Sequence, residues 1–413
     1  MNSSTPGALH GVKVLDLTTM ILGPVTGQYL GDMGADIIKV EPPEGDLTRY
    51  IGPERSHGMG SFYLNSNRNK RSVVLDIKKP AGHAVLNRMI EQSDVVLHSI
   101  RNASAEKLGL SYPALAERNP KIILCHVKGY SDHGAYAGLP AYDDVVQASS
   151  GLAMMQAVIA GEPRYVPSIL ADKVAAVHAA YAVVVALFHR ERTGQGQQVD
   201  VPMMETMVAF NTIEHLWGAA FVPSLAPMGY LPVSTAARRP FKTQDGYLCV
   251  LPYTDAHWKR FCEVVGDPAL TGDPRFSSHA ARQRDQQGFW DEVGRQVQKR
   301  STQHWIDALT VADVPFGRVN SFDDLLADPH LVSIGFWQTM EHPTEGPLRV
   351  SQPPMGFSAS PAGVRRLAPR LGQDTDEVLR EFGVSDGEIE QLRATGVTQP
   401  RLKARAAPTP DVP

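Results

Sequence analysis

The feature that most constrains the fold is a regular alternation of short apolar runs with helix-like segments in the first 130 residues. Five apolar runs have the length and composition of buried strands: residues 12–17, 35–41, 71–77, 94–100 and 121–130. Pro80 is well placed to open the helix that follows the third run, because proline is tolerated at a first helical position. Strands separated by helices pair in parallel, so the pattern predicts an α/β fold with a Rossmann-like, doubly wound parallel sheet.

Ligands of such a sheet bind outside the carboxyl ends of its strands. Those ends fall at residues 18–23, 41–46, 99–103 and 129–134. The glycine fingerprint GxGxxG is missing after the first strand, where the sequence reads TTMILGP and a turn is expected at Gly23-Pro24 before the next helix. The phosphate loop GxxxxGK[ST], the zinc motif HExxH and the nucleophile elbow GxSxG are also missing. Nucleotide hydrolysis, simple NAD chemistry, zinc proteolysis and serine hydrolysis are therefore disfavoured.

The chain of 413 residues is long enough for two domains. The alternation fades after the stretch VDVPMMETMVAF, and we expect the first part of a large domain at 1–205. The run DGYLCVLPY and amphipathic helices such as DAHWKRFCEVVG predict a smaller α+β domain at 225–325. Residues 330–395 contain two short helices with Asp and Ser caps. The Pro/Ala-rich segment 400–413 is expected to be a disordered tail.

The overall composition excludes several classes of partner. A net charge of -4 argues against a nucleic-acid binder, which would carry a basic excess. The three cysteines, Cys125, Cys249 and Cys262, are too far apart for a zinc site or a disulfide framework. We therefore expect no metal and a cytoplasmic location. The N-terminus lacks the basic and apolar regions of a signal peptide.

One long apolar helix is predicted around residues 174–188. It is shorter than the roughly 20 residues that a bilayer requires, and His178 interrupts it, so we expect a buried core helix and no membrane contact. A single carboxylate, Asp172, stands at its start. Asp is a favoured N-cap, and the residues alone make capping the commoner role. A carboxylate held at a helix N-terminus could also serve as a nucleophile, and one residue could do both.

Several stretches occur together in a fixed order along the chain. They are LHGVKVLDLT, MGADIIKVEPPEGDLTR, FYLNSNRNKRSVVLDIKKPAG, AYDDVVQASSG, ADKVAAVHAAYAVVVALFHRERTGQGQQVDVPM and LGQDTDEVL. This set resembles the class III CoA-transferase family, which includes formyl-CoA transferase and carnitine CoA-transferase. The resemblance implies an interlocked homodimer in which residues 330–395 return to a large CoA-binding domain. It also implies coenzyme A or acyl-CoA as substrate, a carboxylic acid as the second substrate, and no permanently bound cofactor.

The resemblance assigns the catalytic nucleophile to Asp172. Such an aspartate forms a mixed anhydride with the acyl group and then an aspartyl-CoA thioester. Because a free Asp has a pKa of about 3.9, it is ionised at neutral pH and needs no general base.

The resemblance also implies binding residues. The CoA contacts carried over from the family are Thr19, Met20, Leu22, Leu75, Lys78, Ser99, Ile100, Lys107 and Met203, and the substrate contacts are Tyr142 and Asp143. Lys78 and Lys107 would bind phosphate, or would simply be solvated. The basic run at 67–71 is either a phosphate-side patch or structural.

The sequence departs from the family at several points. SIRNAS at 99–104 replaces an NFRPG-like stretch, and no tandem-glycine loop precedes DGYLCVLPY. Racemases of the same fold use a histidine base where this chain has Tyr142, so an α-methylacyl-CoA racemase is the less favoured alternative. A non-catalytic CoA-binding protein is a second alternative, which Asp172 argues against.

The acceptor acid is only partly constrained. The apolar turn at 20–22 makes oxalate unexpected and favours an acid with a hydrocarbon body, and succinyl-CoA is the donor that the family suggests. Arg238 and Arg239 could clamp a dicarboxylic acid, although surface charges are the commoner role.

Overall fold

The computed structural model describes residues 5–230 and 232–404. The chain forms two compact units. Unit 1 consists of Met1–Ser150, Val166–Phe210 and Ser333–Pro413, and unit 2 of Gly151–Tyr165 and Asn211–Val332. Most of the 400–413 segment, which was expected to be disordered, lies outside the described residues.

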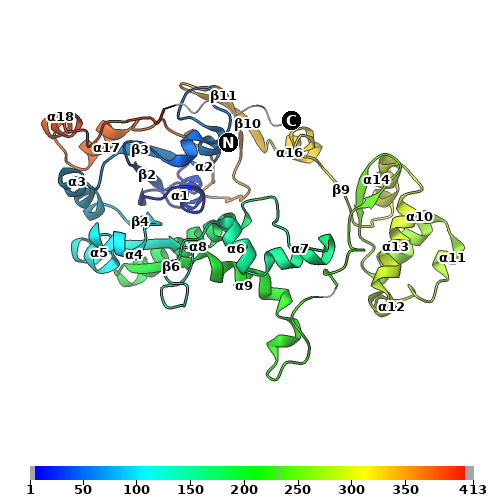
Figure 1. Ribbon diagram of the computed structural model, residues 1–413. Coiled ribbons are helices and arrows are strands. Elements are labelled where there is room, and N and C mark those ends of the chain that lie inside the picture. The colour runs from blue at the N-terminus through cyan, green and yellow to red at the C-terminus, as the bar shows by residue number, and fades with distance from the viewer. Residues whose placement is uncertain (1–4, 231, 405–413) are drawn as a thin grey trace. The chain divides into compact units, whose positions relative to one another are not determined.

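Unit 1 is built on a six-stranded sheet in the order β3-β2-β1-β4-β5-β6 (Figure 1). Its strands are β1 (Lys13–Asp16), β2 (Asp36–Glu41), β3 (Lys70–Val74), β4 (Val95–His98), β5 (Ile123–Lys128) and β6 (Gln197–Pro202). Every neighbouring pair runs in parallel. The doubly wound sheet is thereby confirmed, and β6 adds a strand after the five apolar runs. The strand order reverses between β1 and β4, which is where ligands bind in such sheets.

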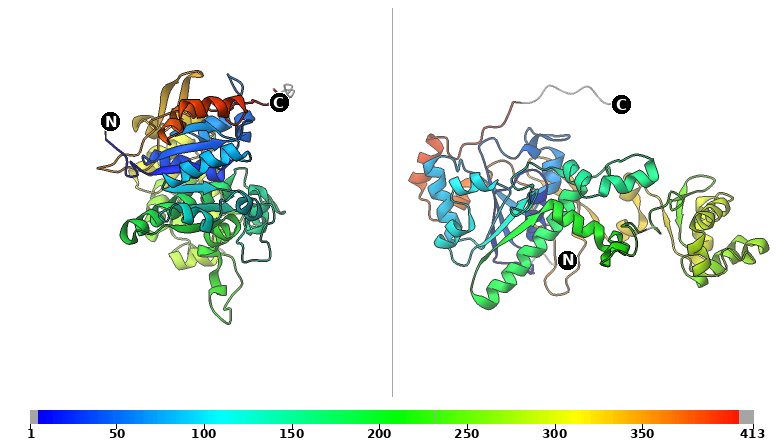
Figure 2. Two further views of the ribbon diagram at one scale, coloured as in Figure 1. Left: turned by 90° about the vertical axis from the view of Figure 1, so that its left-hand side faces the viewer. Right: turned by 60° about the horizontal axis from the view of Figure 1, so that its bottom comes forward.

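Helices cover both faces of this sheet. On one face, α3 (Pro80–Glu91), α5 (Tyr112–Arg118), α17 (Thr375–Glu381) and α18 (Asp386–Ala394) join the strands in one apolar core. Figure 2 shows these C-terminal helices, in red, beside the N-terminal strands, in blue. On the other face, α1 (Leu22–Asp32) and α8 (Leu170–Thr193) pack together and against the strands. The expected helix start at Pro80 and the expected Ser cap at Ser385 are confirmed.

The other elements that lie wholly or partly in unit 1 surround this core. They are η1 (Leu47–Tyr50), α2 (Ser61–Ser66), α4 (Asn102–Lys107), α6 (Asp143–Ser149), α9 (Met203–His215), α16 (Pro329–Ser333) and the antiparallel pair β10 (Trp337–His342) and β11 (Gly346–Ser351). The segment after β11 crosses to β3, where the Asp374 amide donates to the Ser72 carbonyl and the Ser72 amide donates to the Asp374 carboxylate.

Unit 2 is an α+β unit with an antiparallel sheet in the order β7-β8-β9. Its elements are α7 (Leu152–Ala160), η2 (Trp217–Ala220), β7 (Phe241–Lys242), β8 (Tyr247–Val250), α10 (Asp255–Val265), α11 (Pro268–Thr271), α12 (His279–Arg284), α13 (Gln286–Val297), α14 (Thr302–Val311), β9 (Phe316–Arg318) and α15 (Asp324–Ala327). Its core is rich in aromatic side chains, with Trp258 at the centre of contacts to Phe261, Phe276 and Phe289. This core is independent of the sheet in unit 1.

Two expectations for the helices of unit 1 were wrong in detail. The Gly23-Pro24 pair is part of the first turn of α1 and does not form a separate turn before it. Helix α8 is not a fully buried core helix: it buries one face and exposes a second apolar face that includes Tyr181 and Phe188. Within the described residues, α8 is the one helix whose length and composition would permit a membrane span.

Candidate active site

The turn between β1 and α1 lies at the reversal of strand order and has an unusual backbone. Met20 has a φ of 69°, in the left-handed region that non-glycine residues rarely adopt. Gly23 is required nearby, because a Cβ there would lie 2.2 Å from the Thr18 Cβ. Such strain persists only when surrounding contacts hold it, and it is commonly found at functional sites.

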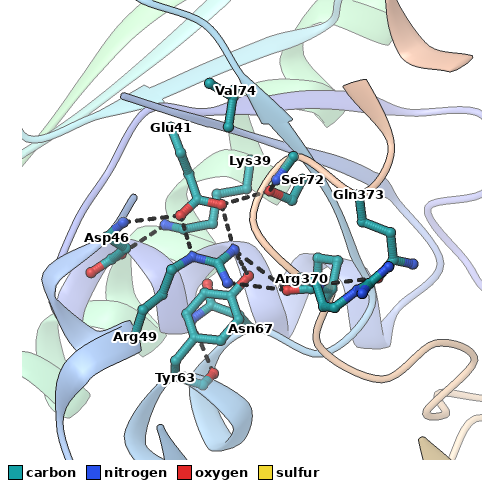
Figure 3. Close-up of polar contacts among 12 residues, drawn as sticks. Lys39, Glu41, Asp46, Arg49, Tyr63, Asn67, Ser72, Val74, Arg370 and Gln373 are labelled. Carbon is teal, nitrogen blue, oxygen red and sulfur yellow. Dashed lines mark hydrogen bonds and ion pairs between the residues drawn. The ribbon is translucent and has the colours of Figure 1, made fainter. Parts of the chain in front are cut away.

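Buried ion pairs supply those contacts (Figure 3). Lys39 Nζ donates to the Thr18 carbonyl at 2.9 Å and pairs with Asp46 at 2.9 Å. The Asp46 carboxylate in turn accepts from the Met20 amide at 3.4 Å. Burial opposes the Lys39 charge, but Asp46, Asp16 and Glu41 raise the pKa of Lys39 above its usual value. The turn is therefore tied to β2 by a charged side chain.

A second buried pair extends the same network. The Arg49 guanidinium contacts both Glu41 oxygens at 2.7 Å and donates to Tyr63 (Figure 3). It also donates to the Pro369 carbonyl. The Ser72 hydroxyl donates to Glu41 at 2.7 Å. Pro369 lies between β11 and α17, so the network links the N-terminal and C-terminal parts of unit 1.

The basic run at 67–71 is part of this internal structure. Arg68 pairs with Asp32, Lys70 with Asp16, and Arg71 with Asp36 and Glu381. Burial lowers the pKa of Lys70 to about 8, although Asp16 favours its charge. These contacts support a structural role for the run at 67–71.

Asp172 lies in the first turn of α8 and does not cap its own helix. The helix begins at Leu170, its N-cap Ile169 offers no side-chain acceptor, and Asp172 is its third residue. The partly buried carboxylate lies near the Leu22 amide at the start of α1, and this amide acts to lower its pKa. One turn further along both helices, the Thr26 hydroxyl contacts the Ala176 carbonyl at 3.4 Å. Two helix N-termini thus meet at one carboxylate, where their dipoles favour a negative charge.

The surroundings of Asp172 change its acidity. Burial and the neighbouring charge of Asp143 raise the pKa of Asp172 to about 6, while the Leu22 amide acts in the opposite direction. The carboxylate is therefore less acidic than the sequence suggested. A carboxylate with this pKa remains mostly ionised at pH 7.

Asp143 has a role that the sequence did not reveal. This buried residue begins α6, and one of its oxygens accepts from the amides of Ala171 at 2.7 Å and Asp172 at 3.2 Å. It therefore caps α8 from a different helix. Tyr142, beside it, exposes 68% of its side chain. Substrate binding by either residue stays a prediction.

The residues assigned to CoA occupy the carboxyl edge of the sheet. Thr19, Met20 and Leu22 follow β1, Ser99 and Ile100 follow β4, Leu75 and Lys78 follow β3, and Met203 follows β6. Leu22, Leu75 and Met203 are buried, Met20 and Ile100 are partly buried, and Thr19, Ser99, Lys78 and Lys107 are exposed. Lys107 ends α4, the helix after β4. The exposed lysines are free to reach a phosphate, and CoA contact stays a prediction for the whole set.

Two further groups of charged side chains are present, one beside β5 and β6 and one in unit 2. His126, Asp132 and Asp200 bring ligand atoms within 4.8 Å of one another, but the Lys128 ammonium lies 2.5 Å from Asp132 and 2.6 Å from Asp200. This ammonium already pairs with both carboxylates. In unit 2, Arg238 and Arg239 are exposed, and Arg239 lies 3.8 Å from Asp291.

A parallel sheet with a carboxylate of raised pKa beside its reversal of strand order defines a Rossmann-like α/β protein with a candidate nucleophile. The particular family follows from similarity in sequence. The chain belongs to CoA-transferase family III, whose model matches residues 9–375.

Characterised relatives cover nearly the whole chain. Succinate–glutarate CoA-transferase of Agrobacterium fabrum is 30% identical over 392 residues, which are 91% of this chain and 95% of the relative. Human succinyl-CoA:glutarate CoA-transferase is 29% identical over 401 residues, or 96% and 91% of the two chains. A crystal structure of a CaiB/BaiF family protein from Brucella suis has a TM-score of 0.79 at 27% identity and covers 91% of this chain and 100% of its own. The protein is therefore an enzyme, a class III CoA-transferase, and the resemblance noted in the sequence is confirmed.

Proposed function

We propose that this enzyme transfers coenzyme A from an acyl-CoA to a carboxylic acid with Asp172 as covalent nucleophile. The observation that carries the proposal is the partly buried Asp172 carboxylate, which lies near the N-termini of α1 and α8 and has a pKa of about 6. A carboxylate in this setting is ionised at neutral pH and yet only moderately stabilised. Both properties favour attack on a thioester carbonyl.

Each step in the first half of the reaction forms one bond and breaks another. An Asp172 oxygen attacks the acyl carbonyl carbon, the carbon–sulfur bond breaks, and CoA leaves as a thiolate. The thiolate then attacks the Asp172 carbonyl carbon of the resulting anhydride and releases the donor acid as a carboxylate. The product is an aspartyl-CoA thioester, so the energy of the thioester bond is retained without ATP.

The second half reverses these steps with the acceptor. Its carboxylate attacks the aspartyl thioester, CoA thiolate leaves again, and this thiolate attacks the acceptor carbonyl of the new anhydride. The acceptor leaves as its CoA thioester, and the Asp172 carboxylate is regenerated. Because each nucleophile and each leaving group is an anion, no step requires a general base.

The substrates proposed are succinyl-CoA as donor and a dicarboxylic acid with a hydrocarbon body, such as glutarate, as acceptor. Two relatives that cover nearly the whole chain are named for succinate or succinyl-CoA and glutarate. The turn beside Asp172 is apolar, and its Ile21 and Leu22 side chains are buried. This composition suits a methylene chain better than the compact, highly polar oxalate ion.

A homodimer is also proposed, from the exposed apolar face of α8. Large apolar side chains lie on one side of this helix at intervals of three or four residues: Val177, Tyr181, Val184, Val185 and Phe188. Together they form an apolar stripe that is unusual on a monomer and is typical of an interface. We propose that a second copy of the chain covers it. A cytoplasmic location remains a proposal, supported by three free cysteines.

The decisive experiment combines turnover with trapping of the covalent intermediate. Purified enzyme is incubated with succinyl-CoA and glutarate, and CoA transfer and a covalent adduct on the Asp172 peptide are followed by mass spectrometry. We expect both for the parent and neither for Asp172→Asn. Turnover by Asp172→Asn at the parent's rate would disprove the nucleophilic role. Deuterium incorporation at the α-carbon of a 2-methylacyl-CoA without transfer would instead support the racemase.

A further inference from the structure

Asp143 and the start of α8 form a structural unit of two helices. The first amides of an α-helix have no partner within the helix and need an acceptor from outside. Ile169 occupies the N-cap position and cannot supply one through its side chain. The Asp143 carboxylate supplies it, since its Oδ1 accepts from the Ala171 and Asp172 amides at 2.7 and 3.2 Å. The turn that contains Asp172 is thus held by a residue 29 positions earlier.

Gln147, one turn further along α6, also holds the backbone that leads into α8. Its Nε2 donates to the second Asp143 oxygen at 2.6 Å and to the Ser168 carbonyl at 3.0 Å. Its Oε1 accepts from the Val166 amide at 2.9 Å. Gln147 is buried, with 1% of its surface exposed, so water does not compete for these bonds. Two side chains on one face of α6 therefore fix the backbone from 166 to 172.

Both Asp143 oxygens are engaged in these contacts. Binding a substrate carboxylate directly would require Asp143 to approach another anion while it lost the α8 amides or Gln147. Its position instead makes it act on Asp172, through the backbone of the Asp172 turn and through its own charge.

The charged groups on the elements packed against α8 leave Asp143 as the principal electrostatic neighbour of Asp172. On α1, Asp32 pairs with Arg68 and Tyr29 lies near it. On β5 and β6, His126 and Lys128 cluster with Asp200, and Cys125 is buried. On α8 itself, Lys173 donates to the Ser168 hydroxyl at 2.6 Å. On α6, Asp144 is exposed, whereas the buried Asp143 contributes directly to the raised pKa of Asp172.

We infer that Asp143 is a positioning residue that, together with Gln147, holds the Asp172 carboxylate in the orientation used for attack. This inference rests on the proposed nucleophilic role of Asp172. It gives Asp143 a role in the chemical step and none in recognition of the acid.

The test compares Asp143→Ala, Asp143→Asn and Gln147→Ala with the parent, and uses Asp144→Asn as the matched control on the same helix. We expect Asp143→Ala to lower kcat by about 100-fold with little change in KM, since a misplaced reactive group costs about that much. Asp143→Asn restores part of this loss, because its amide oxygen can still accept from the α8 amides. The rescue is partial, since the new amide nitrogen faces Gln147 Nε2. Asp144→Asn keeps the parent's kcat.

The pH profile of single-turnover adduct formation separates positioning from a merely structural role. Removing the Asp143 charge lowers the pKa of Asp172, so the acid limb of Asp143→Asn should lie at lower pH than that of the parent. Circular dichroism at each pH monitors folding. If Asp143→Ala does not fold, the pH profile of Asp143→Asn and the kcat of Gln147→Ala, expected to fall by about tenfold, carry the test.

Specific outcomes would overturn the inference. An acid limb in Asp143→Asn that coincides with the parent's, or a raised KM for glutarate at unchanged kcat, would assign Asp143 to structure or to substrate binding. Asp172→Asn is assayed in parallel. If it is inactive while the Asp143 variants match the parent, the positioning role alone fails; if it transfers CoA, the nucleophile proposal fails with it.

Discussion

At the residue scale, Asp172, the proposed nucleophile, lies in a position where its charge is costly for stability. A carboxylate whose folded-state pKa exceeds its unfolded value binds its proton more tightly in the folded protein. Ionising it therefore destabilises the fold. The pKa of Asp172 is raised to about 6 from an ordinary value of 3.8. This group contributes most to stability at low pH, and its contribution decreases as the pH rises through that window.

Replacing Asp172 by asparagine should therefore stabilise the protein at neutral pH. The amide carries no charge and has nearly the same size and shape as the carboxyl group. We expect the free energy of unfolding at pH 7.5 to rise by about 1 to 3 kcal/mol relative to the parent, with little difference at pH 4. Denaturant titration at both pH values and at equal protein concentration checks this. An equal difference at both pH values would show that ionisation is not the cause.

Glu41 illustrates the opposite case, a charge that the fold needs. It is buried, and its oxygens accept from Arg49, Ser72 and the Asp46 amide. Glu41→Ala leaves the buried Arg49 without its main partner, so we expect a loss of about 3 to 5 kcal/mol in the free energy of unfolding. Thermal or urea unfolding measures it. Glu44→Ala, an exposed carboxylate three residues later, is the control and should change stability by less than about 0.5 kcal/mol.

These residue-scale features were only partly predictable from the sequence. Asp172 was identified because it lies beside a long apolar helix and inside a family motif. Its raised pKa was not predictable, since it results from burial and from Asp143, 29 positions away in the chain. The basic run at 67–71 suggested either role, and only the folded structure pairs each charge with an acid. A pattern of i, i+4 residues in α6, Asp143 and Gln147, was the one available hint of the cap.

At the scale of elements, the strands of the sheet and the helices that cover it could be predicted, because apolar runs and helical segments alternate regularly in the sequence. The turn after β1 was predicted less accurately. Its Gly-Pro pair was expected to precede the helix, whereas both residues lie within the first turn of α1. Proline is tolerated there, because the first amides of a helix lack intrahelical partners in any case. The exposed face of α8 was also missed, because an apolar composition does not distinguish a core from an interface.

Gly23 is the residue on which the geometry of this turn depends. A methyl group at position 23 would overlap the Thr18 side chain, with 2.2 Å between the two Cβ atoms. Gly23→Ala must therefore displace the turn and the Leu22 amide that lies near Asp172. We expect kcat to fall by at least about tenfold, as measured in the CoA-transfer assay. Gly387→Ala, in α18 at a position with no atom within 4 Å, is the control and should leave kcat unchanged.

At the scale of the whole molecule, the apolar stripe on α8 determines the proposed assembly. Tyr181 exposes 67% of its side chain at the middle of this stripe. A charge placed there would be buried without a partner in a dimer, so Tyr181→Asp should shift the protein toward the monomer. Sedimentation velocity or light scattering over a range of concentrations measures the shift. Tyr136→Asp, an exposed tyrosine outside the stripe, should not change the association state; a monomeric parent would refute the dimer proposal.

The joining of Ser72 to Asp374 has a consequence for how the protein is made. These two residues are 302 positions apart, and they connect β3 to the last helices of the same unit. A ribosome adding about 5 to 20 residues per second needs about 15 to 60 seconds to synthesise the intervening chain. For that interval the nascent strands lack two of the four helices that cover one face of the sheet. Molecular chaperones that shield apolar surface during translation should therefore determine the yield of this protein in cells more than its final stability does.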